Sequence, residues 1–318
     1  TVTVGGNSAS TISGPDNGSS GYHLAAPTDF NVADATGDAN ADLYCSGVLV
    51  DQDGAGTAFG HLGAPGSLVK TGAGTMVLSG ANAYHGETIV NDGTLLVNGD
   101  SSAATGAVTV SFGATLGGHG ILGGATEVQS GGTLSPGASI GALTFNNSLT
   151  LDAGSESIFE ISKSPATNDV VNIFGVLING GTLMVTNISA SPLAAGDSFQ
   201  LFNAGSYQGA FASVILPGLS AGLAWDTSAL NTSGRLTVAS LAPPQFGGIH
   251  LNGGAVVLAA TNGTPSASCV VLGSTNLTLV PADWTPLATN VFDGNVNFSY
   301  TDAINANAPQ MFYRLVSP

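Results

Sequence analysis

Oxygen-bearing side chains alternate in one short stretch near the start of the chain. In "DATGDANAD" every second position carries a carboxylate, hydroxyl or amide: Asp34, Thr36, Asp38, Asn40 and Asp42. Calcium prefers oxygen ligands that one loop supplies at such intervals. The stretch lacks a Gly directly after Asp38 and a terminal Glu that would bind through both oxygens, so a polar turn is the alternative. Calcium is the only cofactor that the sequence suggests.

The candidates for acid–base catalysis are less specific than those for calcium. Glycoside hydrolysis needs two carboxylates on either side of the scissile bond, and the middle of the chain supplies seven: Glu87, Asp92, Asp100, Glu127, Asp152, Glu156 and Glu160. Most of them fall at expected turns or outward strand positions. His85 and Glu87 could pair as a base and its partner, but no recognisable nucleophile adjoins them. We therefore predict no catalytic residue, and a polysaccharide-degrading enzyme is the least favoured function.

Two cysteines, Cys45 and Cys269, lie far apart in the sequence. They form no Cys-x-x-Cys pair, which argues against a metal knuckle and a thioredoxin-like site. They form either one disulfide, within the chain or between chains, or two buried thiols.

The composition of the chain excludes some classes of binding partner. The chain has 318 residues, of which only 8% are charged, and four Lys and Arg face 20 Asp and Glu, for a formal net charge of −16. Such a surface repels phosphate backbones and anionic lipid, so we expect no nucleic acid as a partner. No apolar run reaches the roughly 18 residues of a membrane span, so we expect no membrane insertion.

The elements that must position these residues repeat along the chain. Thr followed by an apolar residue recurs at steps of 19, 21, 18 and 17 residues, measured between Met76, Leu95, Leu116, Leu134 and Leu151. Each period contains two short strands around a Gly-rich turn, with Leu95 and Val97, Val108 and Val110, and also Ile89 expected to face inward. A coil of this length cannot bury its own apolar face, so coils must stack as a solenoid. A flat antiparallel sandwich is the alternative.

The character of the chain changes after Leu241. "APPQFGG" contains a Pro pair that interrupts strand pairing, and longer strands rich in aromatic residues follow, with Trp284 as a core residue. We predict three parts: an N-terminal strand and cap at 1–45, a parallel β-helix at 46–241, and a small antiparallel β-sandwich at 242–318. The predicted fold class is all-β.

Residues 68–99 carry the most specific motif. "LVKTGAGTMVLSGANAYHGETIVNDGTLLVNG" resembles the autotransporter-associated β-strand repeat in the following residues: Leu68, Lys70, Gly72, Gly74, Thr75, Leu78, Gly80, Asn82, Tyr84, Gly86, Thr88, Val90, Gly93, Thr94 and Leu95. The resemblance implies a right-handed parallel β-helix in an extracellular bacterial surface protein, and it implies no reaction. The C-terminal stretches "VVLGSTNLTLVPADWTPLATN" and "APQMFYRL", within residues 270–315, are also similar to a small β-sandwich that ends many secreted bacterial proteins.

The first residues suggest a mode of assembly. Thr1, Val2, Thr3 and Val4 alternate as in a strand and precede Gly-Gly. They either begin the first coil or pair with an edge strand of the next molecule, which would build a head-to-tail filament. We therefore expect an extracellular, self-assembling structural protein, with any signal peptide already removed, and a homo-oligomer or homopolymer. A monomeric adhesin or a stalk that binds a cell-surface glycan is the alternative.

Overall fold

A computed structural model describes residues 1–14, 21–38, 40–51, 65–263, 267–293, 297–305 and 310–316. The chain divides into two compact units, the first formed by residues 1–219 and 225–238 and the second by residues 220–224 and 239–318. Residues 1–45, predicted as a separate cap, lie within the first unit. In the described part of the chain, no helix is long and apolar enough to cross a membrane.

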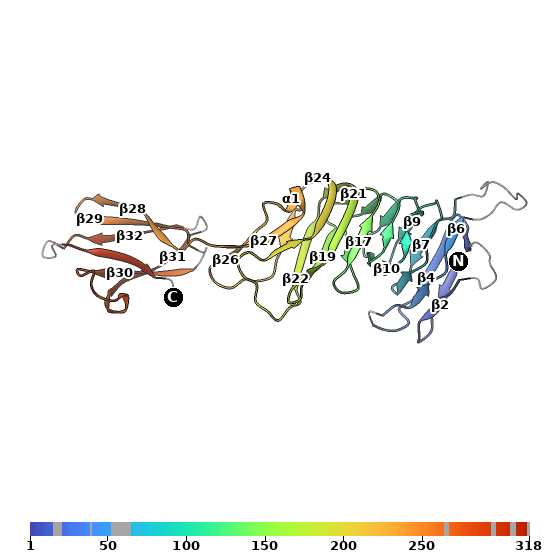
Figure 1. Cartoon of the computed structure of the whole chain (residues 1–318), viewed down its shortest axis with the longest axis horizontal. Helices are drawn as coiled ribbons and strands as arrows, with labels where there is room; N and C mark the ends of the chain where they lie inside the picture. The colour runs from blue at the N-terminus through green and yellow to red at the C-terminus, as the bar shows by residue number, and fades with distance from the viewer. Residues whose placement is uncertain are drawn as a thin grey trace, which may run out of the picture. The chain divides into compact units, whose positions relative to one another are not determined.

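The first unit is a parallel β-helix, as the fold class predicted (Figure 1). Its larger sheet has 12 strands, which pair almost entirely in parallel with strands of the neighbouring coils. In sheet order these are β1 (Val2–Val4), β4 (Thr28–Val32), β7 (Leu68–Thr71), β9 (Thr88–Val90), β12 (Val108–Val110), β15 (Thr126–Val128), β18 (Leu149–Leu151), β21 (Val170–Asn179), β17 (Ala142–Phe145), β14 (Ile121–Leu122) and β11 (Asp100–Ser101), with β24 (Phe202–Gly209) beside β21.

A second sheet of 10 strands forms another wall of the helix. In order, it contains β2 (Ser10–Ile12), β5 (Leu43–Cys45), β8 (Thr75–Leu78), β10 (Thr94–Val97), β13 (Thr115–Gly118), β16 (Thr133–Pro136), β19 (Glu156–Lys163), β22 (Thr182–Asn187) and β25 (Ser213–Ile215), with β20 (Ala166–Asn168) antiparallel to β19. The short strands β3 (Tyr22–Leu24) and β6 (Leu49–Asp51) form a further parallel pair.

The predicted repeat sets the register of the second sheet. Thr75, Thr94, Thr115 and Thr133 lie side by side on consecutive strands, and the apolar residue after each is likewise aligned. The prediction that Thr150 is the fifth member of this row was wrong. Thr150 lies in β18 of the larger sheet, opposite Glu127. The true continuation after Thr133 is Glu156, which pairs next with Thr182.

The interior of the helix follows the expected alternation with one correction. Leu95, Val97 and Val110 are buried as predicted. Ile89 is only half-buried, and its neighbours Thr88 and Val90 point inward instead. Thr88 tolerates this position because its hydroxyl has a buried partner, described below.

Glycine columns form two corners of the coils. Gly66, Gly86, Gly106 and Gly124 stack in one column, and a Cβ added at Gly106 would lie 1.9 Å from the carbonyl oxygen of Gly86. Gly80, Gly99 and Gly120 form a second column with the same close approach to the coil before. The backbones of neighbouring coils therefore come closer at these corners than any side chain allows.

Aromatic rings fill the last coils of the first unit. Phe202 packs against Phe159 and Phe211 with ring centroids 4.8 and 5.8 Å away, and Phe199 packs against Trp225 at 6.2 Å. The short helix α1 (Leu230–Ser233) and a three-stranded sheet accompany them: β23 (Ser198–Gln200), β27 (Arg235–Ser240) and β26 (Leu223–Asp226). These elements close the apolar interior at this end.

The second unit contains two antiparallel sheets, as predicted for a sandwich. Trp284 is 8% exposed and donates from its indole nitrogen to the carbonyl of Leu279. Cys269 and Phe292 form a buried cluster with Ala260. The sheets are β28 (Gln245–Asn252), β29 (Ala255–Thr261) and β32 (Phe298–Ala303), and β31 (Thr285–Val291), β30 (Ser268–Ser274) and β33 (Phe312–Val316), with the turn η1 (Pro281–Asp283) before Trp284.

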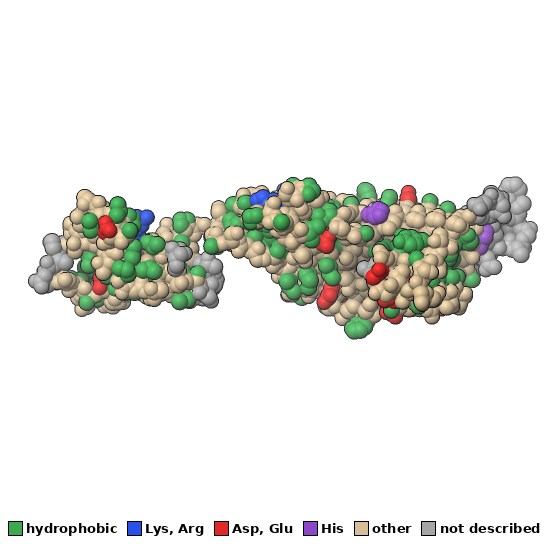
Figure 2. Space-filling view, turned by 90° about the horizontal axis from the view of Figure 1, so that it is seen from below, with side chains coloured by type: hydrophobic (Ala, Val, Ile, Leu, Met, Phe, Trp, Pro, Cys, Tyr) green, Lys and Arg blue, Asp and Glu red, His purple; other side chains and the backbone are tan. Residues whose placement is uncertain are grey.

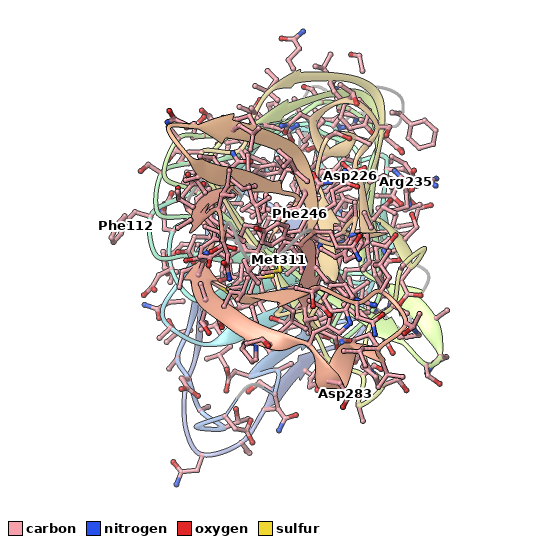
Figure 3. The ribbon with its side chains drawn as sticks, turned by 90° about the vertical axis from the view of Figure 1, so that its left-hand side faces the viewer. Phe112, Asp226, Arg235, Phe246, Asp283 and Met311 are labelled. Atoms are coloured by element: carbon pink, nitrogen blue, oxygen red, sulfur yellow. The ribbon has the colours of Figure 1, made fainter. Side chains whose placement is uncertain are left out.

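Few charges mark the surface of the first unit. On the face seen in Figure 2, carboxylate side chains are scattered among uncharged ones. One ring stands out: Phe112, in the turn after β12, is 80% exposed and projects outward (Figure 3). Its ring atoms cover Gly131 of the next coil.

Candidate functional site

The carboxylate of Asp42 holds its loop from within the protein. Asp42 is 1% exposed. Its Oδ1 accepts hydrogen bonds from the backbone of Ala35 and Thr36 at 2.8 Å and from the Thr36 hydroxyl at 3.0 Å, while Oδ2 accepts from the Thr75 backbone at 2.8 Å. Burial alone would raise the pKa of Asp42, but these hydrogen bonds together lower it. Asp42 thus fastens the loop to β8.

The other predicted calcium ligands serve local turns. Asp38 accepts from the backbone and the side-chain amide of Asn40, each at 2.8 Å. Asp34 accepts from the Gly37 backbone at 2.8 Å. Over the described residues, no three His, Cys, Asp or Glu side chains gather as a metal site would require. The structure therefore gives these alternating oxygens partners within the chain, and calcium stays a prediction.

Lys70 is completely buried, which its place in a strand of the repeat did not suggest. Its Nζ donates to the backbone carbonyls of Thr71 at 3.1 Å, Gly72 at 2.6 Å and Asp92 at 3.0 Å. Burial lowers the pKa of Lys70 to about 8, against the opposing attraction of Asp92 and Asp42. All three ammonium donors are used on the backbone, so this Lys offers nothing to a ligand.

Two further polar residues of the repeat also point inward. Asn82 is 1% exposed; it accepts from the Leu49 backbone and donates to the Ser101 hydroxyl, both at 3.0 Å. Tyr84 is buried with its hydroxyl 2.6 Å from that of Thr88, and burial raises its pKa to about 12. Asn82 thus joins neighbouring coils, whereas Tyr84 bonds to a residue four positions along the chain.

His85 has a partner other than the predicted one. Its Nδ1 lies 2.6 Å from Oδ2 of Asp51, and its backbone donates to the other oxygen at 2.8 Å. Asp51 also accepts from the Gly66 backbone. The His85 side chain is 58% exposed, so the pair is a solvated corner.

The proposed assembly and disulfide residues each have a definite place. Val2, Thr3 and Val4 form β1 and pair in parallel with β4 of the same chain. Cys45 and Cys269 are buried with free thiols, one in β5 and one in β30. Burial raises the pKa of Cys45 to about 11. Strand exchange between molecules and a disulfide stay predictions.

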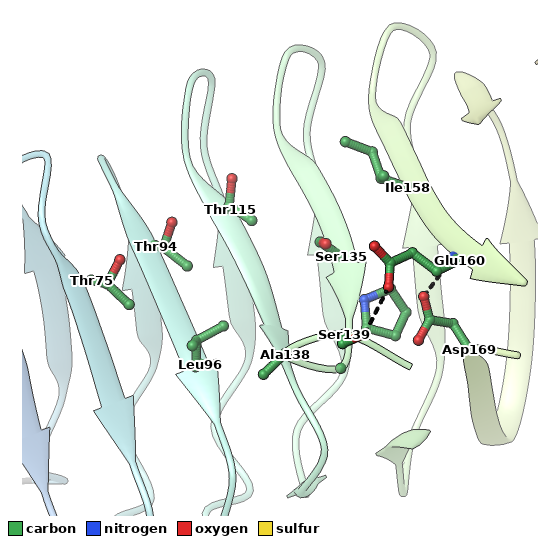
Figure 4. Close-up of a pocket in the computed structure, with 12 residues that line it drawn as sticks. Thr75, Thr94, Leu96, Thr115, Ser135, Ala138, Ser139, Ile158, Glu160 and Asp169 are labelled. Carbon is green, nitrogen blue, oxygen red and sulfur yellow. Dashed lines mark hydrogen bonds between the residues drawn. The ribbon is translucent and has the colours of Figure 1, made fainter. Parts of the chain in front are cut away.

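The outer face of the 10-stranded sheet contains a groove of about 390 Å³ (Figure 4). Its lining comes from consecutive strands β8 to β19 and from the loop after β16. Five hydroxyl residues, two carboxylates, four apolar residues and one glycine line it: Thr75, Thr94, Leu96, Thr115, Ser135, Pro136, Gly137, Ala138, Ser139, Ile158, Glu160 and Asp169. It is the candidate functional site of the chain.

Two carboxylates form one wall of the groove. Asp169, only 2% exposed, accepts from the Gly141 backbone at 2.8 Å and from the Glu160 backbone at 2.6 Å. Burial raises the pKa of Asp169 to about 6, although both hydrogen bonds oppose the shift. Glu160 accepts from the Ser139 hydroxyl at 3.2 Å. Both carboxylates therefore hold the loop 137–141 against the sheet.

Comparison with known proteins now explains the buried polar residues. Residues 68–97 match the family model of the passenger-associated-transport-repeat. The chain carries this repeat. Lys70, Asn82 and Tyr84 all belong to it; Lys70 and Asn82 connect neighbouring coils, and Tyr84 bonds locally to Thr88. The predicted resemblance is confirmed.

Two relatives share longer segments with the chain. A segment of 161 residues is 34% identical to the adhesin BmaC autotransporter of Brucella suis biovar 1 (strain 1330), and covers 48% of this chain but 5% of the adhesin. Another of 121 residues is 33% identical to an extracellular serine protease of Serratia marcescens, over 38% of this chain and 11% of the protease. The chain thus spans a small part of the length of either relative.

The sequence did not reveal the groove. Asp169 could not be predicted as a site residue because it lies in "TNDVVNIF" with no partner nearby in the sequence. Its partner Gly141 lies 28 residues away. The threonine ladder is visible in the sequence as a repeat, and on its own it predicts the fold. Its regular spacing was the available signal for a row of outward hydroxyls.

Proposed function

We propose that the chain is a non-enzymatic structural segment of an extracellular bacterial surface protein, a β-helical stalk of adhesin type. One observation carries the proposal: three polar residues of the passenger-associated-transport-repeat are buried, with their polar groups bonded within the helix. Lys70 and Asn82 bind groups of adjacent coils, and the Tyr84 hydroxyl is bonded to that of Thr88, four residues further along the chain. A repeat whose polar groups face inward serves architecture rather than chemistry.

The relatives support the location. One is named an autotransporter adhesin and the other an extracellular protease. The two groove carboxylates do not favour hydrolysis, because both oxygens of Asp169 already accept backbone N–H groups and none is directed to a substrate. A stalk that carries binding surfaces away from the cell fits these observations.

Surface labelling tests this proposal. Antibodies raised against the purified chain should label intact, unpermeabilised cells of the organism that makes it, and protease added outside should remove the signal. A cytoplasmic control protein must stay unlabelled in the same cells. Labelling that requires permeabilisation would contradict the proposal.

Head-to-tail assembly is the second candidate. Among the described residues β1 pairs only with β4, so it is the first strand of its sheet. Such a strand offers backbone groups for pairing with another chain. Sizing and electron microscopy of the purified chain at high concentration test this. Filaments that disappear on deletion of residues 1–6, while the melting curve of the chain persists, would support it; a monomer at every concentration would refute it.

A further inference from the structure

The hydroxyl ladder in the groove is available to a ligand. Thr94 and Thr115 are half-buried, aligned neighbours on β10 and β13, and Ser135 lies on β16 two residues further along, opposite Gly117. Within the described residues, no hydrogen bond to the protein uses these three side-chain hydroxyls, whereas the hydroxyls of Thr36 and Thr88, and of Ser139 in the wall of the groove, have partners. Each free hydroxyl can both donate and accept. Strand pairing places Thr94 and Thr115 about 4.8 Å apart, and Ser135 extends the polar surface on the next strand.

Apolar side chains border this polar row. Leu96 and Ile158 are half-buried on the outer face of the sheet, and Pro136 lies at the start of the neighbouring loop. Figure 4 shows Leu96 and Ile158 on opposite sides of the strand that carries Ser135. The groove therefore alternates hydroxyls with small aliphatic surfaces, as a ligand with hydroxyls around a carbon ring requires.

Charge and backbone geometry narrow the class of ligand. Among the described lining residues none is basic and two, Glu160 and Asp169, are acidic, so anionic groups such as uronates or phosphates are disfavoured. A peptide strand is also a poor fit. The strands that form the floor of the groove already pair with a neighbouring strand on both sides. The groove therefore presents side chains to a ligand, and no unpaired backbone groups with which a peptide strand could pair.

We propose that this groove binds a neutral oligosaccharide. The hydroxyls of Thr94, Thr115 and Ser135 exchange hydrogen bonds with sugar hydroxyls, and Leu96 and Ile158 contact the ring faces. The Ser139 loop, held by Glu160 and Asp169, forms one wall. The inference rests on the proposed function only in that an extracellular stalk meets glycans.

Binding by the full chain tests this inference. A glycan array with neutral and uronate-containing oligosaccharides identifies ligands, and calorimetry measures their affinity. Thr115→Val removes one hydroxyl while keeping the shape, and we expect about fivefold weaker binding. Thr94→Val with Thr115→Val should cost at least about 20-fold, and Ser135→Tyr should fill the groove and abolish binding.

Thr109→Val is the matched control. Thr109 is also half-buried and belongs to the same coil, but it lies on β12 of the other sheet. The Thr109→Val variant should bind the oligosaccharide with wild-type affinity. All variants should keep the wild-type melting temperature. The inference is overturned if the array retains no neutral glycan, if uronate oligomers bind as well as neutral ones, or if the groove variants bind like Thr109→Val. Surface labelling of cells is independent of each result, so the stalk proposal stands or falls separately.

Discussion

The Nζ atom of Lys70 lies 3.0 Å from the carbonyl oxygen of Asp92, which belongs to the next coil of the β-helix. The same ammonium group also binds the carbonyls of Thr71 and Gly72 in its own coil. One fully buried cation therefore joins two coils through their backbones. A buried charge is tolerated only when its donors are satisfied in this way.

Replacing Lys70 should weaken the helix considerably. Lys70→Met keeps the aliphatic stem but leaves three carbonyl oxygens without their donor, so we expect the free energy of unfolding to fall by about 3 kcal/mol. Urea unfolding followed by circular dichroism measures it. Lys163→Met is the control: Lys163 is a partly exposed residue 3.0 Å from Asp197, and its loss should cost under about 1 kcal/mol. Equal effects of the two variants would contradict this assignment.

The lowered pKa of Lys70 predicts a dependence on pH. In the folded chain the pKa is about 8, against 10.5 for an ordinary Lys. Between these values the unfolded chain binds more protons, so the contribution of Lys70 to stability rises as pH increases from about 8 to 10.5. The difference in unfolding free energy between wild type and Lys70→Met should therefore grow over this range. A flat difference would show that the pKa is not lowered.

The contribution of Asp42 to stability should depend on pH in the acidic range instead. Its pKa is lowered in the folded chain by four hydrogen bonds that outweigh burial, so its contribution is present above the ordinary value of 3.8 and is lost as pH falls below it. Asp42→Asn should cost about 2 kcal/mol at pH 7, because an amide cannot accept through both ends. The gap to wild type should narrow in titrations below pH 4, and a constant gap would oppose the assignment.

Calcium should have little effect on this loop. The oxygens of Asp38 and Asp42 already accept hydrogen bonds from the chain, so the melting temperature should be the same in millimolar calcium and in chelator. Calorimetric scans with and without the ion decide this. A rise that Asp38→Asn removes would instead establish the metal site predicted from the sequence.

The glycine columns predict a cost that depends on space rather than on backbone angles. Gly106→Ala would place a Cβ atom 1.9 Å from the Gly86 carbonyl oxygen, so the coils must separate, and we expect a loss of at least about 3 kcal/mol. Gly113 has a positive φ of 79° but open space around it, so Gly113→Ala should cost only about 1 kcal/mol. Denaturant unfolding of both variants compares the two effects, and the reverse order would refute the argument.

The repeat could be predicted from the sequence because its signal is local. Thr75, Thr94, Thr115 and Thr133 follow Gly or Gly-Ala in similar turns, and these residues are aligned in the sheet. Thr150 lacked that preceding glycine, and it lies in the other sheet. Here the turn chemistry was a better guide than the Thr-apolar pair itself.

The inward position of the polar repeat residues could not be predicted in the same way. The partners of Lys70 and Asn82 are supplied by coils about 20 to 30 residues away, so their burial is satisfied only once the coils stack. The alternation of apolar and polar residues predicts that polar side chains in a strand face outward. The groove could not be predicted for the same reason. Its wall depends on a hydrogen bond from the Gly141 backbone to Asp169, and these two residues are 28 positions apart in the sequence.

The aligned ladder also separates what must stay constant in this chain from what can change. Successive threonines keep their register even though the coils between them contain 19, 21 and 18 residues. Each additional residue is therefore accommodated in a corner and leaves the sheets undisturbed. Loops at those corners can lengthen or change composition at little cost to the stack, so one scaffold can acquire new surface features without losing its core.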